Sequence, residues 1–171
     1  EKKILRNVLE PGDAWFRTGD LLRKDEKGYY YFVDRIGDTF RRKGENVATS
    51  EVAEIIGGFP GVQHANVYGV AVPGVEGRVG MAMLVTDRDL DLAGLRNHLA
   101  GCLPPYARPV FLRIRGQADL TGTFKYSKTE LLREGYNPDA CAGSLYFDNA
   151  EEFVPLDSDL YQRIQAGEFR I

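Results

Sequence analysis

Short apolar and aromatic runs, separated by turns that contain glycine, mark the beginning of the chain. Residues 21–23 and the aromatic run 29–33 are typical of β-strands, because aromatic and β-branched side chains suit a pleated surface. The charged segment 24–28 lies between them and ends in glycine, which favours a turn. The pattern therefore predicts a β-hairpin that ends near Asp34 and Arg35.

Past residue 48, the spacing of apolar residues alternates between the period of a helix and that of a strand. Positions 52, 55, 56 and 59 are apolar and share one face of an amphipathic helix that begins near Ser50. Asp91 is a typical N-cap for a second helix with leucines at helical spacing. Further predicted elements are strands at 67–72, 79–86 and 110–115, and helices at 128–134 and 157–166.

The order of these elements predicts an α+β fold, with a small sheet of about three main strands and flanking helices after the initial β-hairpin. In the strand at 110–115, Val110, Leu112 and Ile114 alternate with Phe111 and two arginines. This alternation predicts a half-exposed strand.

A basic turn joins the hairpin to the first helix. Arg41, Arg42 and Lys43 stand together and Gly44 follows them. Because glycine accepts backbone angles that other residues resist, the chain is expected to turn there. A flexible basic turn suits a hinge that meets a phosphate-bearing ligand, and the alternative is a surface hairpin with solvated arginines.

Composition narrows the class of protein. Hydrophobic residues make up 43% and charged residues 27% of 171, which is typical of a globular protein, and the net charge of −3 argues against a general nucleic-acid binder. Two isolated cysteines predict a reducing compartment such as the cytoplasm, and neither histidine has neighbours at metal-ligand spacing. No apolar run approaches the roughly 18 residues that span a bilayer.

Four polar features are candidates for chemistry. Asp20 follows Thr18-Gly19 in a tight turn, where a carboxylate can accept hydrogen bonds from paired sugar hydroxyls, and Arg35 could donate to the same sugar. The basic turn is the third feature. The fourth is Lys125, which follows a loop of small residues, and a lysine on a flexible stem can bridge a carboxylate and a phosphate as charge develops. No P-loop motif is present.

Five motifs occur in a specific order along nearly the whole chain: WFRTGDLL, GYYYFVDRIGD, RKGENVATSEV, LPPYARPVFLRI and TGTFKYSKTELLREGYNP. In this order they resemble the C-terminal end of adenylate-forming enzymes, the superfamily of acyl-CoA synthetases, peptide-synthetase adenylation domains and luciferases. KGENVATSEV, TGTFK and the late LYF and FVPL segments resemble the fatty acid transport protein branch, the long- and very-long-chain acyl-CoA synthetases.

The resemblance implies a role for each candidate. Asp20 and Arg35 match the residues that hold the ribose of ATP or acyl-AMP. Lys125 matches the catalytic lysine of adenylation, which touches the substrate carboxylate and the α-phosphate. The segment Lys43-Gly44-Glu45-Asn46 matches the loop that borders the CoA pantetheine tunnel in the thioester-forming state.

Two positions depart from the pattern of the family. Gly37 falls at the hinge, where relatives usually carry Asp, Lys or Gln, and glycine is expected to loosen it. Phe124 stands before Lys125, where glycine is usual.

The resemblance further implies that residues 1–36 are the end of a large N-terminal adenylating domain and that 38–171 form a mobile C-terminal lid. The complete enzyme would join a long- or very-long-chain fatty acid to CoA through acyl-AMP, using ATP, CoA and a Mg²⁺ ion held by the N-terminal domain. That domain and the fatty acid would be the partners of this chain, and a lipid substrate leaves room for peripheral membrane contact. The chain begins at Glu1 rather than Met, and as a fragment it is expected to be inactive.

Two alternatives stay open at this stage. One is another acid:CoA ligase of the same branch, acting on a bile acid or a carnitine-like acid. The other is a non-catalytic interaction module that keeps the fold of the lid.

Overall fold

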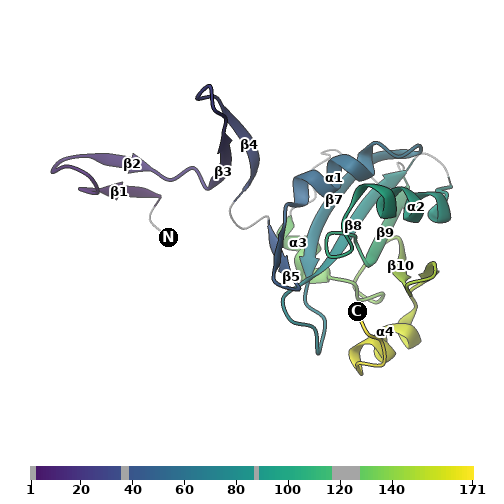
Figure 1. The fold of residues 1–171 in the computed structure, drawn as a ribbon. Coiled ribbons are helices and arrows are strands. Elements are labelled where there is room, and N and C mark those ends of the chain that lie inside the picture. Colours follow the sequence, from purple (N-terminus) through teal and green to yellow (C-terminus); the bar gives the residue numbers. More distant parts are fainter. Residues whose placement is uncertain (1–2, 36–38, 87–88, 117–127) are drawn as a thin grey trace. The chain divides into compact units, whose positions relative to one another are not determined.

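The computed structural model describes residues 3–35, 39–86, 89–116 and 128–171. The chain divides into two compact units, residues 1–38 and 39–171 (Figure 1). The division falls close to the boundary between residues 36 and 38 that the family resemblance implies. The assignment of the first unit to a larger adenylating domain stays a prediction.

The first unit consists of two antiparallel hairpins. Strands β1 (Ile4–Arg6) and β2 (Ala14–Phe16) form one, and β3 (Asp20–Lys24) and β4 (Tyr30–Arg35) form the other. The second hairpin confirms the prediction from the aromatic run. The first hairpin was not predicted, because β1 is mixed in character and acquires its strand form by pairing with the aromatic β2.

A single carboxylate organises the loop between β1 and β2. Asp13 accepts hydrogen bonds of 2.8 to 3.0 Å from the backbone N–H groups of Val8, Leu9 and Glu10 and from the indole N–H of Trp15. These donors, with Leu9 and then Trp15 contributing most, hold the pKa of Asp13 well below its usual range.

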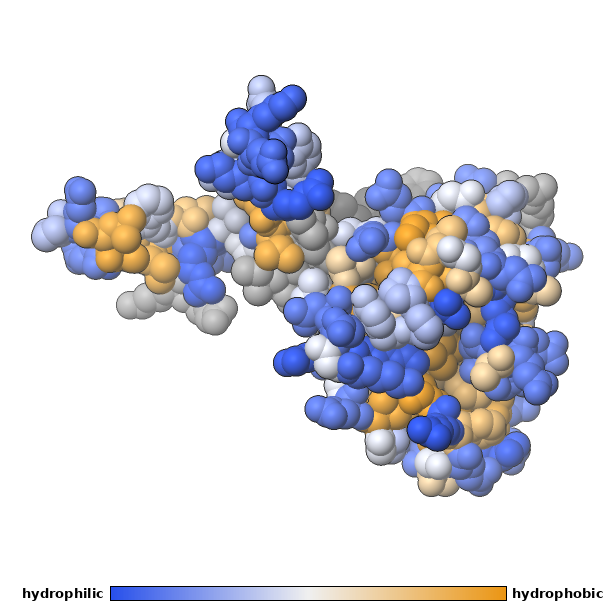
Figure 2. Space-filling view, in the orientation of Figure 1, coloured by the Kyte–Doolittle hydropathy of each residue, from blue (hydrophilic) through white to orange (hydrophobic). Residues whose placement is uncertain are grey.

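The first unit has almost no core of its own. None of residues 3–32 is buried, and its large apolar side chains reach the surface, as Figure 2 shows for the β1–β2 hairpin. Trp15 is 50%, Phe16 64% and Leu9 73% exposed. An isolated two-stranded hairpin is only marginally stable in water, so these surfaces need a covering body.

The second unit is built on a five-stranded sheet with the order β11-β10-β9-β8-β7. Its strands are β7 (Val62–Val70), β8 (Val79–Thr86), β9 (Phe111–Gly116), β10 (Ser144–Asp148) and β11 (Phe153–Pro155), and its helices are α1 (Thr49–Gly57), α2 (Leu92–Cys102), α3 (Lys128–Glu134) and α4 (Ser158–Gln165). All pairs are antiparallel except β8 with β9, which run parallel. The α+β class is confirmed.

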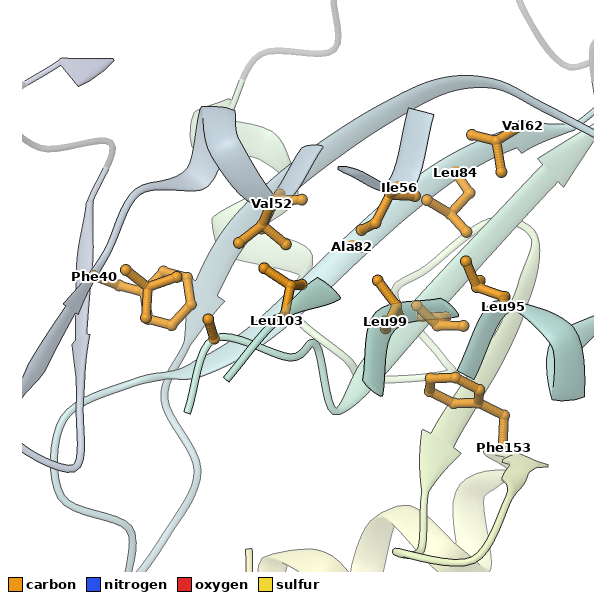
Figure 3. Packing of buried hydrophobic residues seen from close by; sticks show 14 residues of the cluster. Phe40, Val52, Ile56, Val62, Ala82, Leu84, Leu95, Leu99, Leu103 and Phe153 are labelled. Atoms are coloured by element: carbon orange, nitrogen blue, oxygen red, sulfur yellow. The ribbon is translucent and has the colours of Figure 1, made fainter. Parts of the chain in front are cut away.

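Helices cover both faces of this sheet. On one face, Val52 and Ile56 of α1 and Leu95 and Leu99 of α2 pack on Ala82 and its neighbours in the central strands, as Figure 3 shows. On the other face, the cluster contains buried residues of α3 and α4 together with Tyr68, Met81, Met83, Phe111 and Phe147. Asp91 caps α2 as predicted, since its side chain accepts a 2.9 Å hydrogen bond from the N–H of Gly94.

The sheet is larger than the three main strands that the sequence pattern predicted. Strands β10 and β11 extend it beyond β9, and they were missed because they are short and depend on pairing with a distant partner. The expectation that 110–115 is a half-exposed strand was wrong. Phe111 and Leu112 are both fully buried, and Arg113 is 2% exposed, because β9 lies inside the sheet between β8 and β10.

Arg113 is tolerated in the interior because Glu134, at the end of α3, forms an ion pair with it. Its Nε also donates a 2.8 Å hydrogen bond to the carbonyl of Ala142. Burial is the largest single influence and lowers the pKa of Arg113, but the hydrogen bond to Glu134 and the charges of neighbouring groups together raise it. The pair thereby ties α3 to the centre of the sheet.

Neighbouring leucines on α3 provide a test of this packing. Leu131 is fully buried, whereas Leu132 is 44% exposed. We expect Leu131→Ala to lower the free energy of unfolding of the second unit by about 2–5 kcal/mol, and Leu132→Ala by less than about 1 kcal/mol. Urea denaturation of the 171-residue chain, followed by far-UV circular dichroism, measures both. Equal losses would contradict the assignment of the buried face of α3.

Candidate functional site

The two residues expected to hold a ribose lie opposite each other in one hairpin. Asp20 is the first residue of β3, and its Cα is the cross-strand partner of the Cα of Arg35 at the end of β4. Directly opposed residues are close enough for their side chains to act together. An acceptor and a donor at such a position suit a pair of sugar hydroxyls.

Local structure fixes the backbone at Asp20. Gly19 has a φ of 82°, which favours glycine, and the N–H of Asp20 donates a 3.1 Å hydrogen bond to Oγ1 of Thr18. The side chain of Asp20 is half-buried. The Thr-Gly-Asp sequence therefore forms the tight turn predicted for it, while the side chain of Arg35 lies outside the described part of the chain.

The basic turn is the tip of a third hairpin, formed by β5 (Phe40–Arg42) and β6 (Glu45–Val47). Lys43 and Gly44 occupy the two turn positions with φ values of 50° and 86°, as a two-residue hairpin of the type I′ class requires. The four residues Lys43, Gly44, Glu45 and Asn46 are all exposed. The predicted turn at Gly44 is confirmed.

This hairpin is docked firmly on the sheet rather than free to flex. Phe40 is 5% exposed and lies against Gly69 and Gly80, where a β-carbon would come within 2.6 and 3.3 Å of its side chain. The N–H of Arg78 donates a 2.8 Å hydrogen bond to the carbonyl of Arg41. The expectation of a flexible turn is therefore corrected, because glycines on two paired strands make room for the hairpin to pack closely.

The prediction that Arg42 lies on the exposed surface of the turn is also corrected. Phe40 and Arg42 point inward while Arg41 between them points outward, so the basic run is divided between the interior and solvent. Arg42 is 5% exposed, and its Nη1 donates a 3.1 Å hydrogen bond to the carbonyl of Arg108. Burial lowers its pKa. Alternation with the apolar Phe40 is the sequence signal that could have revealed this inward position.

Arg41 and Lys43 are the two cations that stay on the outside of the turn. Nε of Arg41 donates a 3.2 Å hydrogen bond to the carbonyl of Gly44, which braces the turn across its width. Lys43 carries its charge at the tip. An exposed turn that carries a lysine ammonium can approach a narrow, anionic ligand from one side.

Lys125 and Gly37, predicted as catalytic and hinge residues, both lie outside the described residues. Of the described helices, none combines the length and the apolar character that crossing a bilayer would need. Within the described ranges, His, Cys, Asp and Glu side chains do not gather in groups of three that could hold a metal ion.

Comparison with known proteins supports the resemblance found in the motifs. Residues 51–125 match the family described as AMP-binding enzyme C-terminal domain. Long-chain fatty acid transport protein 2 from Rattus norvegicus is 49% identical over 168 residues, which cover 96% of this chain and 27% of that protein. The chain thus spans about a quarter of the length of this relative.

Two acyl-CoA synthetases are similar in structure. A Mycobacterium tuberculosis fatty acyl CoA synthetase matches with a TM-score of 0.54 and 29% identity, over 70% of this chain and 24% of that chain. o-Succinylbenzoate CoA synthetase from Bacillus subtilis, in complex with the acyl-adenylate intermediate OSB-AMP, matches with a TM-score of 0.55 and 30% identity, over 59% and 21%. Its complex with ATP and a magnesium ion matches with a TM-score of 0.54 and 31% identity, over the same shares. The fold predicted from the motifs is confirmed.

The geometry of the turn generates a stability prediction. A β-carbon at Gly44 would meet nothing within 4 Å, so Gly44→Ala tests the positive φ alone. We expect it to lower the free energy of unfolding by about 1 kcal/mol, because alanine is strained in this conformation. Gly101 in α2 is equally open but has no positive φ, and Gly101→Ala is expected to be neutral or stabilising. Urea denaturation measures both, and a Gly44→Ala variant as stable as Gly101→Ala would contradict the turn geometry.

Proposed function

We propose that this chain, which belongs to the AMP-binding enzymes through their C-terminal domain, is the C-terminal portion of an AMP-forming fatty acid:CoA ligase. The observation that carries the proposal is the cross-strand pairing of Asp20 with Arg35, at the two positions where the motifs expect ribose contacts. The exposed tip 43–46 on a firmly docked hairpin supports it further.

The proposed reaction has two steps. A carboxylate oxygen of the fatty acid attacks the α-phosphorus of ATP and expels pyrophosphate, which gives acyl-AMP. The thiol sulfur of CoA then attacks the acyl carbon, loses its proton and expels AMP, which gives the thioester. Negative charge builds up around the α-phosphate in the first step, and a positioned lysine such as Lys125 would stabilise it.

The residues of this chain have distinct places in the two steps. Asp20 accepts hydrogen bonds from the ribose hydroxyls, and Arg35 donates to the same sugar. Lys125 contacts the carboxylate and the α-phosphate during adenylation. The tip Lys43-Gly44-Glu45-Asn46 borders the entry of the CoA pantetheine during thioester formation. In the proposal, a rotation about Gly37 replaces Lys125 with the tip 43–46 at the active site, as occurs in lids that complete an active site.

The exposed apolar surface of the first unit favours residues 1–36 as the end of a larger domain. Apart from Leu132, every large hydrophobic side chain that is exposed among the described residues lies between positions 4 and 32. A surface of this kind is usually buried by a partner. The large N-terminal domain would bury it, and residues 38–171, which have their own two-sided core, would form the lid.

ATP, CoA and a fatty acid are the proposed substrates, with magnesium bound in the N-terminal domain. The name of the rat relative favours a long-chain fatty acid over a bile acid or a carnitine-like acid. The o-succinylbenzoate enzyme does not enter this choice, because the acyl pocket would lie in the N-terminal domain. Contact with a membrane surface during delivery of the lipid substrate is part of the proposal.

Replacement of Lys125 by alanine tests the proposed ligase activity. In the full-length protein, Lys125→Ala is expected to slow formation of acyl-AMP by roughly 100- to 1,000-fold, since a group that stabilises transition-state charge is lost. Transfer of a preformed acyl-AMP to CoA should stay within about threefold of wild type. Palmitate-dependent pyrophosphate exchange and thioester formation from palmitoyl-AMP measure the two steps. Lys27→Ala, in the turn between β3 and β4, is the matched control.

An unchanged exchange rate in Lys125→Ala would favour a non-catalytic interaction module. A loss of both steps together would also count against the assigned role, since it would indicate general damage rather than a specific contribution to adenylation.

The chain by itself provides a second test. With ATP, palmitate and CoA, the isolated 171 residues should form no palmitoyl-CoA above background, because a site needs its full set of ligand contacts to be competent. Thin-layer or mass-spectrometric detection of palmitoyl-CoA measures this. Robust turnover by the isolated chain would refute the division of the site between two domains.

A further inference from the structure

We infer that Arg42 is a positioning residue for thioester formation, holding the tip 43–46 at the orientation that the second half-reaction needs. The inference rests on the proposed function and adds to it a residue that contacts neither nucleotide nor CoA. It assigns to the interior of the lid a role that the exposed tip cannot fulfil by itself.

The position of Arg42 in the hairpin gives it control of the tip. Arg42 and Glu45 are cross-strand partners that directly flank the two-residue turn. Whatever fixes the backbone at Arg42 therefore fixes the direction in which Lys43 and Gly44 project. Because the side chain points inward, it connects the exposed turn to the core on which the hairpin lies.

The connection continues into helix α2. Nη1 of Arg42 donates to the carbonyl of Arg108 at 3.1 Å. Arg108 is itself fixed, since its Nε donates to the carbonyl of Leu103 at 2.8 Å and its Nη2 to that of Ala100 at 3.0 Å. A hydrogen-bonded path thus runs from the C-terminal end of α2, through Arg108, to the base of the turn.

Stability alone does not explain an arginine here. Arg42 forms no ion pair with a carboxylate of the described residues, and its buried Nε has no hydrogen-bond partner. The charge of Asp148 reaches it at longer range, but that carboxylate already accepts a 3.0 Å bond from Arg96. Burying a charge with incomplete partners is costly, and an apolar residue of similar length is often at least as stable. The directional bond to the Arg108 carbonyl is what a methionine could not reproduce.

A second set of contacts holds the same hairpin from its other side. Gly77 forms a bridge with Arg42, and a β-carbon at Gly77 would lie 2.3 Å from the carbonyl oxygen of Arg41. Gly77→Ala would therefore push the hairpin, Arg42 included, away from the sheet while the arginine side chain itself is kept. It offers an independent way to displace the tip.

The experiment measures both half-reactions in the full-length protein. Arg42→Met is expected to slow transfer of preformed palmitoyl-AMP to CoA by roughly 10- to 100-fold, since small misplacements of a reacting group have effects of this size. Palmitate-dependent pyrophosphate exchange should stay within about twofold, and the melting temperature should be unchanged or raised. Arg42→Lys keeps one donor and should recover most of the lost transfer rate. Arg163→Met, at an exposed ion pair on α4, should change neither step.

Gly77→Ala should reproduce the selective loss of the transfer step, which tests the placement of the tip. If Arg42→Met fails to fold, Arg42→Lys tests the side chain in its place. Equal losses in both half-reactions, or no loss in either, would overturn the inference while leaving the ligase intact. The proposed function would fail in a different way, because the wild-type protein would then form no palmitoyl-CoA.

Discussion

Complete burial of strand β8 is the constraint on which the second unit depends. All eight of its residues, from Val79 to Thr86, are buried. Successive side chains of a strand point to opposite faces, so each face of β8 must be covered by its own layer. Ala82 and Leu84 face α1 and α2, and Met81 and Met83 face the side that α3 and α4 cover. The parallel pairing of β8 with β9 requires a crossover, and α2 lies in that connection.

The β5–β6 hairpin that carries the basic turn is held in place by packing against this strand. Gly77 and Arg78 directly precede β8, and Gly80 lies within it, so the β5–β6 hairpin is seated where the most buried strand begins. The carbonyl of Gly80 also accepts a 2.8 Å hydrogen bond from the N–H of Val110, close to the Arg108 carbonyl that holds Arg42. The tip therefore moves with the sheet. Any large displacement of the tip therefore requires the second unit to move as a whole.

Features with local causes were predictable from the sequence. The apolar run of β8, the capping of α2 by Asp91 and the turn at Gly44 each depend on residues within a few positions, and each was found. Features with distant causes were missed. β10 becomes a strand because it pairs with β9 about thirty residues earlier, and Arg113 is buried because Glu134 meets it there.

In the candidate site, too, features with local causes were predictable and features with distant causes were not. The hairpin that brings Asp20 opposite Arg35 was predictable, because the turn and the aromatic strand between them set its register locally, whereas their ligand stays a prediction. Both interpretations of the basic turn required an exposed Arg42, because its inward direction depends on Arg108, 66 positions away. The motif resemblance singled out these residues, but the three-dimensional arrangement was needed to distinguish the exposed side chains of the turn from the buried Arg42 beneath it.

The two units differ in what stabilises them, and this difference bears on mechanism. Residues 39–171 bury two clusters of their own, whereas none of residues 3–32 is buried. The break at residues 38 and 39 falls between the Asp20–Arg35 pair and the basic turn. A nucleotide held through Asp20 and Arg35, as proposed above, would then stay with the first unit, while the turn belongs to a unit that has its own core. An enzyme arranged in this way can exchange one catalytic element for another without releasing acyl-AMP, because the parts that move and the parts that hold the intermediate have separate cores.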